Sequence, residues 1–163
     1  MATISLIRID YRLIHGQIIT KWMRQTNANR IAVIDDKLSQ DPFMSKIYVM
    51  AAPPGVKVEM LTIKDAVDSW NKNEMGAGNI LVLFKGVPST YEAWKNGFPI
   101  SNLQVGGLGS EPGRKVVYNQ ITLNKADGDK LSEMETGGVK VLFQTVPEDK
   151  PADLHKILKK ANF

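Results

Sequence analysis

The stretch IRIDYRLIHGQ, residues 7–17, carries one aspartate, two arginines and one histidine between two apolar segments. Its apolar beginning continues the β-type segment Ile4–Ile7, and the amphipathic run Ile18–Met23 follows it. The charged turn therefore lies where a first strand ends and a first helix begins. In open α/β sheets this is the usual place for ligands, because helix N-termini present free N–H groups at the carboxyl ends of the strands.

Outward from this turn, β-type runs alternate with helical patterns along the whole chain. The expected strands are Ile4–Ile9, Ile31–Ile34, Val56–Leu61, Ile80–Phe84, Leu103–Val105 and Val139–Phe143, and the expected helices are Gly16–Arg24, Asp41–Ala52, Lys64–Asn71, Ser89–Asn96, Lys125–Glu135 and Pro151–Ala161. Most of these strands are continuously apolar, which is typical of strands covered on both faces. The alternation predicts an α/β fold, a single open, mostly parallel, doubly wound sheet with helices on both faces.

One further strand is expected in the second half of the chain. Lys115–Leu123 (KVVYNQITL) has a β-type pattern and follows the glycine-rich loop Gly106–Gly113. A short connection without a helix allows one antiparallel pairing in this region. Neither a repeat nor a linker divides the chain, so residues 1–163 are expected to form one domain.

Composition excludes several function classes. The chain has no cysteine, so disulfides, thiolate metal sites and a cysteine nucleophile are ruled out. No apolar stretch approaches the roughly 20 residues needed to span a bilayer, and no secretory signal is recognisable, which favours a cytoplasmic location. The net charge of +4 comes from dispersed Lys and Arg residues. Without a basic stripe, no nucleic-acid partner is expected.

The histidine of the first turn, His15, has neighbours suited to phosphate chemistry. A neutral imidazole is a good nucleophile toward phosphorus, and the planar fork of Arg12 fits phosphate oxygens. Backbone N–H groups around Gly16 and Gln17 add donors, and Gly16 permits close approach of an oxyanion. Asp10 has two possible roles, to accept a hydrogen bond from the imidazole or to anchor Arg12, and the residues leave both open. Phosphoryl transfer mainly needs such positioning and charge stabilisation.

The motif Arg8–Gln17 closely resembles the N-terminal motif of the IIB components of the mannose/fructose/sorbose family of the bacterial phosphotransferase system. The resemblance extends over essentially the whole chain. It includes the Asp35-Asp36 turn, Ala52–Val58, the Val105–Gly107 turn and Gly138–Pro147, whose order agrees with the family. The first motif is specific, whereas the others add weight mainly through their order.

The resemblance implies a phosphotransferase that works as a phosphocarrier in sugar uptake. His15 would accept a phosphoryl group, at Nδ1, from a IIA domain or protein and pass it to a sugar that the IIC and IID membrane components translocate. Arg12 would clamp the phosphate and Asp10 would orient the site. The resemblance further implies a seven-stranded sheet with the histidine loop at its topological switch point, a possible homodimer and peripheral attachment to the membrane through the permease. Neither a cofactor nor a metal is expected, and the identity of the sugar stays open.

Two residues depart from the family pattern. Tyr11 stands where family members usually carry an acidic or amide residue, so a carboxylate is missing there. Gln104 replaces the usual asparagine before Val105-Gly106-Gly107, which puts an asparagine-mediated loop contact in doubt.

Other residues offer weaker candidates at the same sheet edge. Lys85 follows a buried strand and is assigned either a supporting phosphate or partner contact or an ordinary solvated loop position. Gly106 and Gly107 belong to a turn that is also suited to form an anion-binding nest. The Asp35-Asp36 pair does not match the spacing of a phosphorylated receiver domain, so a helix cap or a place at the rim of the site is preferred. His155 lies in a lysine-rich terminal helix and is expected to face water.

Three alternative functions can be weighed against the carrier. The segment Ile14–Gly16 superficially resembles the motif of histidine phosphatases and mutases that act on small phosphoesters. Those enzymes need a second active-site histidine, and His155 is poorly placed for that role. A nucleotide-binding module is disfavoured because neither a G-x-G-x-x-G turn nor a Walker sequence occurs. Nucleic-acid binding rests on the pI of about 9.2 alone.

Overall fold

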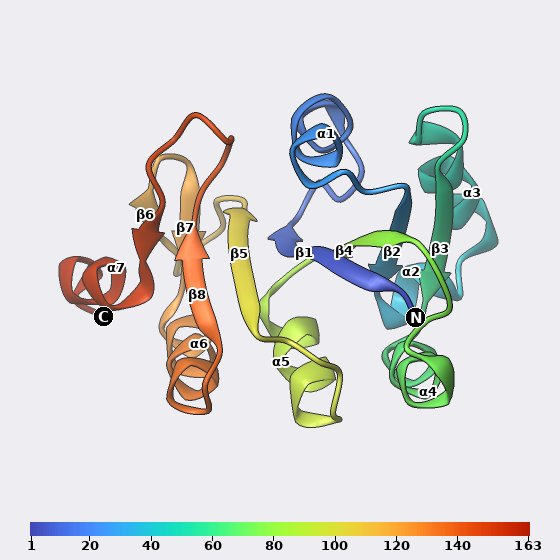
Figure 1. Cartoon of the computed structure of the whole chain (residues 1–163). Helices are drawn as coiled ribbons and strands as arrows, with labels where there is room; N and C mark the ends of the chain where they lie inside the picture. Colours follow the sequence, from blue (N-terminus) through green and yellow to red (C-terminus); the bar gives the residue numbers. More distant parts are fainter.

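The fold is built around a seven-stranded sheet in the order β3-β2-β4-β1-β5-β8-β9, seen in the computed structural model of residues 1–163 (Figure 1). Its strands are β1 (Thr3–Asp10), β2 (Arg30–Ile34), β3 (Lys57–Leu61), β4 (Asn79–Phe84), β5 (Asn102–Gly107), β8 (Lys140–Phe143) and β9 (Ala152–Asp153). All neighbours in the sheet run parallel except β8 and β9. The predicted fold class is confirmed, and β9 is its antiparallel strand.

The helices form two groups on opposite faces of the sheet (Figure 1). The first group is α4 (Ile63–Asn73), α5 (Val87–Lys95), α6 (Lys125–Thr136) and α7 (Leu154–Ala161), which contribute to the larger core. The second is the π-helical turn η1 (Ile18–Trp22), α1 (Met23–Thr26), α2 (Asp36–Ser39) and α3 (Pro42–Ala51), which lie with the smaller core.

Each central strand divides its side chains between these two cores. In β4, Ile80, Val82 and Phe84 belong to the larger core, whereas Leu81 and Leu83 belong to the smaller one. Successive side chains of a strand point to opposite faces, so a strand covered on both faces must be apolar throughout. This explains the unbroken apolar runs of β2 and β4.

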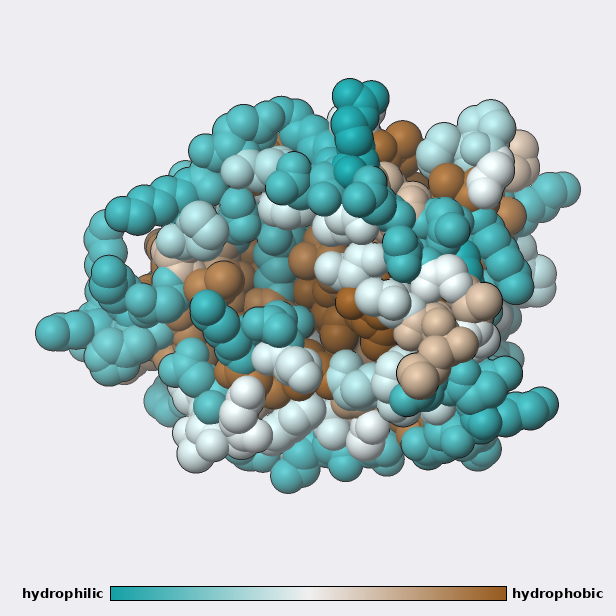
Figure 2. Space-filling view, in the orientation of Figure 1, coloured by the Kyte–Doolittle hydropathy of each residue, from teal (hydrophilic) through white to brown (hydrophobic).

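The helices of the second group cover only part of their face of the sheet. Leu103 and Val105 of β5 enter the larger core, while Asn102 and Gln104 point to the other side, where no helix packs (Figure 1). A cavity of about 420 Å³ lies there, lined by side chains of β1, β5 and β8. In the same orientation, Figure 2 shows a hollow with apolar side chains near the middle of the molecule. The alternating polar and apolar residues of β5 are the sequence sign of this one-sided cover.

The prediction of a single strand over Lys115–Leu123 is wrong, because the segment forms two short strands. The segment forms a hairpin of β6 (Lys115–Tyr118) and β7 (Ile121–Leu123), which is antiparallel as expected but separate from the main sheet. Asn119 reverses the chain with φ of 46°, a left-handed conformation that asparagine tolerates better than most residues.

The last predicted helix begins later than expected. Residues Ala152–Asp153 pair with β8 as β9, and α7 starts only at Leu154. The Asp153 side chain accepts a hydrogen bond from the Lys156 N–H at 2.9 Å, which makes Asp153 the N-cap. The cap at Asp41 with Pro42 in the first turn of α3 is confirmed.

Candidate functional site

The predicted histidine turn begins at the carboxyl end of β1, which lies between β4 and β5 in the middle of the sheet. The Leu13 N–H donates to the Asp10 carbonyl at 2.9 Å and closes the turn. Leu13 has φ of 57°, an uncommon conformation for a residue with a branched side chain. Its side chain is fully buried in the smaller core, which holds this backbone in place. The π-helical turn η1 begins shortly after the turn, at Ile18, and π-helical turns often occur at functional sites.

Asp10 is the centre of the site, and its carboxylate is fully buried. It accepts hydrogen bonds from the backbone N–H and the Nε of Arg12, both at 3.1 Å, and from Arg12 Nη2 at 3.2 Å. A second arginine, Arg8, donates from Nη2 at 3.1 Å. Asp10 therefore anchors Arg12, which is one of the two roles that the sequence left open for this carboxylate.

His15 lies beside this carboxylate without a hydrogen bond to it. Its Nε2 is 3.8 Å from Asp10 Oδ2, which is longer than a hydrogen bond, and its Nδ1 is 2.9 Å from the Leu13 carbonyl oxygen. The Nε2 atom is buried and has no hydrogen-bond partner, while 18% of the side chain remains exposed. Nδ1 is thus held by the backbone and Nε2 faces the buried carboxylate, so the exposed part of the ring does not include Nε2.

Arg12 forms the exposed wall of the site. Its side chain is 35% exposed, and its guanidinium is 5.7 Å from the centre of the Tyr11 ring. Its Nη2 also lies 3.5 Å from Gln17 Oε1, whereas Nη1 makes no hydrogen bond within the protein. The bonds to Asp10 fix the guanidinium and leave Nη1 without a hydrogen-bond partner in the protein.

The structure also shows how Tyr11 and Gly16, two other residues of the turn, are placed. Tyr11 is half exposed and packs beside Gly109, so it forms part of the rim of the site. Around Gly16 no atom comes within 4 Å of the position that a Cβ would occupy. The backbone at Gly16 is therefore accessible to a ligand, as its predicted role requires.

Arg8 is the residue that sequence reasoning missed. Its side chain is fully buried, and besides Asp10 it binds Gln104 Oε1 at 2.5 Å and the carbonyl oxygens of Gln144 and Thr145, both at 3.0 Å. Burial lowers the pKa of the guanidinium below its usual value, and the nearby Asp10 partly offsets this shift. An arginine between Ile7 and Ile9 in an expected strand was the available signal, because an arginine is almost never fully buried unless it is paired.

The two glycines predicted as ligand contacts stand against the charged side chains of β1. A Cβ on Gly106 would lie 1.9 Å from Arg8 Cζ, and a Cβ on Gly107 would lie 2.8 Å from Asp10 Oδ1. The Gly107 carbonyl also accepts the Tyr11 N–H at 3.0 Å. Glycine is needed at both positions so that Arg8 and Asp10 fit beside β5.

The remaining candidates make no hydrogen bond or ion pair with His15. Lys85 lines a cavity of about 430 Å³ together with Arg114 and with Tyr11 of the histidine turn. Asp35 caps α2, with its carboxylate 2.9 Å from the Leu38 N–H, as preferred from the sequence. His155 is exposed on α7, next to the outermost strand β9.

The structure has neither a side-chain group suited to a metal ion nor a helix suited to cross a membrane. No group of three or more His, Asp or Glu side chains is arranged to hold a metal ion. None of the helices combines the length and apolar character that crossing a membrane requires.

Comparison with known proteins gives consistent matches over the whole chain. Residues 4–163 match the family model described as the PTS system sorbose subfamily IIB component. The sorbose-specific EIIB component of Klebsiella pneumoniae is 32% identical over 146 residues, which are 90% of this chain and 89% of that protein. The mannose-specific EIIAB component of Escherichia coli K12 is 26% identical over 96% of this chain, which spans 49% of that longer protein.

Solved structures agree with these sequence matches. The crystal structure of manxB from Thermoanaerobacter tengcongensis superposes with a TM-score of 0.91 at 35% identity, covering 100% of this chain and 99% of the other.

Proposed function

The chain belongs to the sorbose subfamily of IIB components of the phosphotransferase system, and we propose that it carries a phosphoryl group on His15 from a IIA donor to a sugar. The observation that carries this proposal is the arrangement of Asp10, Arg12 and His15 at the carboxyl end of β1. A partly exposed imidazole and the Arg12 guanidinium both lie beside the Asp10 carboxylate, which holds the arginine in place. Nucleophile and phosphate-binding cation are thus side by side before any partner arrives.

The first transfer forms and breaks one P–N bond. A ring nitrogen of His15 attacks the phosphorus of a phosphohistidine on the donor, and the donor's P–N bond breaks as the new one forms. His15 loses its ring proton, and the departing donor imidazole gains one. Arg12 Nη1 and the backbone N–H groups at Gly16 and Gln17 offset the charge that the phosphoryl oxygens carry.

The second transfer regenerates His15. A sugar hydroxyl oxygen attacks the phosphorus, the P–N bond breaks, and the hydroxyl proton ends on the imidazole that leaves. The family resemblance points to Nδ1 as the reacting nitrogen. Nδ1 now lies 2.9 Å from the Leu13 carbonyl oxygen, so the ring must turn about its Cβ–Cγ bond to present this atom to a donor.

The proposed partners follow from the relatives. The Escherichia coli relative is named as a joined EIIAB component, which supports a IIA domain or protein as the donor. For the second step we propose the IIC and IID membrane components, with the carrier working in the cytoplasm at the membrane surface. A homodimer remains part of this proposal.

The experiment supplies phosphoenolpyruvate, enzyme I, HPr and a IIA protein, and measures phosphate bound to this chain. We expect one equivalent that is labile in acid and stable in alkali, as a phosphohistidine is. The competing phosphatase function predicts hydrolysis of free phosphoesters without any IIA protein. Such hydrolysis, without a stable phosphoprotein, would contradict the carrier function.

Replacing Arg12 by alanine is expected to slow transfer to His15 about 10- to 100-fold, because a hydrogen bond to a charged group contributes about 1.5–3 kcal/mol. The rate of phosphoprotein formation, followed by rapid quench in alkali, measures the effect. Arg24→Ala serves as a control, since Arg24 is exposed on α1. Equal rates for Arg12→Ala and the control would show that Arg12 does not bind the phosphate.

A further inference from the structure

Arg8 brings together three segments that are far apart in the sequence. Its guanidinium binds Asp10 on its own strand, Gln104 on β5, and the backbone carbonyls of Gln144 and Thr145 just after β8. Removing an arginine from water is costly, and only several well-placed acceptors compensate for it. The fold provides such acceptors from three directions for this one side chain.

The space around the guanidinium is also shaped to fit it. Gly106 leaves the room that a Cβ would take, and the Trp22 ring lies 5.3 Å from Arg8 Cζ. The Trp22 Nε1–H donates to the Thr145 carbonyl at 3.0 Å, the same oxygen that accepts from Arg8 Nη2. The Arg8 guanidinium is therefore held by the Trp22 ring as well as by its hydrogen-bond acceptors, in space that Gly106 leaves free.

This position has two consequences for the histidine site. First, Arg8 occupies Asp10 Oδ2 and so fixes the carboxylate, whose Oδ1 then receives the N–H and Nε of Arg12. Second, its charge offsets that of Asp10, which lies only 3.8 Å from His15 Nε2. Without Arg8, the Asp10 carboxylate would cancel the charge of Arg12, which would then attract the phosphoryl oxygens less strongly.

We propose that Arg8 is a positioning residue for phosphoryl transfer, and that Gln104 holds Arg8 in its working place. Arg8 acts through Asp10 and does not touch the phosphate. With the charges of Arg8 and Asp10 balanced, Arg12 presents a net positive charge to the phosphoryl oxygens. This inference rests on the proposed carrier function of His15.

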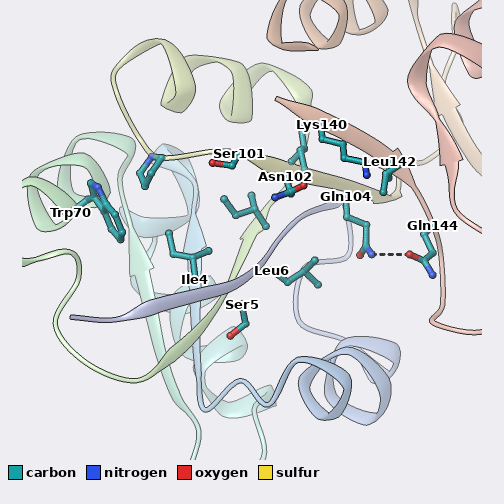
Figure 3. A pocket seen from close by; sticks show the side chains of 13 residues that line it. Ile4, Ser5, Leu6, Trp70, Ser101, Asn102, Gln104, Lys140, Leu142 and Gln144 are labelled. Atoms are coloured by element: carbon teal, nitrogen blue, oxygen red, sulfur yellow. Dashed lines mark hydrogen bonds between the residues drawn. The ribbon is translucent and has the colours of Figure 1, made fainter. Parts of the chain in front are cut away.

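Gln104 allows a test that leaves all charged residues in place. Its side chain points from β5 into the cavity on the uncovered face, where Gln104 Nε2 meets Gln144 Oε1 at 3.4 Å (Figure 3). Asn102 lies two residues earlier on the same strand and lines the same cavity, but it makes no hydrogen bond to Arg8 (Figure 3). Asn102 is thus a matched control.

The test compares Gln104→Met with Asn102→Met in the transfer assay from phosphorylated IIA. Losing a hydrogen bond to a charged group predicts about a tenfold lower maximal rate for Gln104→Met, with KM for the donor unchanged within about twofold. Asn102→Met is expected to match the wild type in both quantities. Arg8→Lys, which keeps the charge but loses the fork, is expected to lower the maximal rate by at least as much as Gln104→Met.

Melting temperatures measured on the same samples separate positioning from folding. A lower maximal rate in Gln104→Met that melts like Asn102→Met supports the proposal. Wild-type maximal rates in both Gln104→Met and folded Arg8→Lys would overturn it, as would a rate loss shared equally by Asn102→Met. A wild-type chain that gains no phosphate on His15 would instead refute the carrier function itself.

Discussion

His15→Ala is expected to gain no phosphate from a phosphorylated IIA protein under conditions in which the wild type gains one equivalent. The substitution removes the nucleophile, and no nearby group can replace it. The chain has no cysteine and only one other histidine, His155, which is exposed on α7 far along the sheet. Acid-labile phosphate, quantified after removal of the donor, measures the effect.

The matched control for this prediction is His155→Ala. It changes the same residue type on an exposed helix surface and should be labelled like the wild type. The proposal fails if His15→Ala retains label, or if His155→Ala loses it. Binding of the IIA protein, measured by titration calorimetry, should be similar in both variants, because alanine at position 15 removes the chemistry and little of the surface.

Asp10→Asn is expected to lower the free energy of unfolding by about 3–5 kcal/mol, the usual cost of removing one partner of a buried ion pair. The asparagine keeps the shape but loses the charge that accompanies buried Arg8. It also replaces a carboxylate oxygen by an amide N–H₂ group that cannot accept from either arginine. Equilibrium unfolding in urea measures the difference.

A surface aspartate provides the comparison. Asp68 pairs with Lys64 at 2.6 Å on the exposed face of α4. Asp68→Asn should lower the free energy of unfolding far less than Asp10→Asn does, because exposed ion pairs contribute little. If Asp10→Asn cost no more than Asp68→Asn, the buried pair of Arg8 and Asp10 would contribute no more to stability than an exposed pair.

Local patterns predicted the sheet where both of its faces are covered. β2 and β4 were recognised because two-sided burial requires continuous apolar residues, and this requirement is visible within five or six positions. The short strand β9 was missed because its two residues pair only through their position beside β8. The same holds for the hairpin, since KVVYNQITL reads as one strand until Asn119 adopts a left-handed conformation.

The functional site, too, was predictable only where its residues are close together in the sequence. The turn composition placed Asp10, Arg12 and His15 together because they are neighbours in the sequence. The role of Arg8 was out of reach because its contact with Gln104 joins residues 96 positions apart and depends on the register of β1 against β5. The departure noted at Gln104 pointed to this position, but only the structure shows that its side chain binds Arg8.

The most direct test of the central claim is a long-range ¹H–¹⁵N spectrum of the ¹⁵N-labelled protein before and after phosphorylation by the IIA relay. With two histidines in the chain, each imidazole gives its own set of signals. We predict that one ring nitrogen of His15 shifts and couples to phosphorus, while the signals of His155 stay in place. Unchanged His15 signals in a fully phosphorylated sample, or phosphorus coupling at His155, would contradict the account.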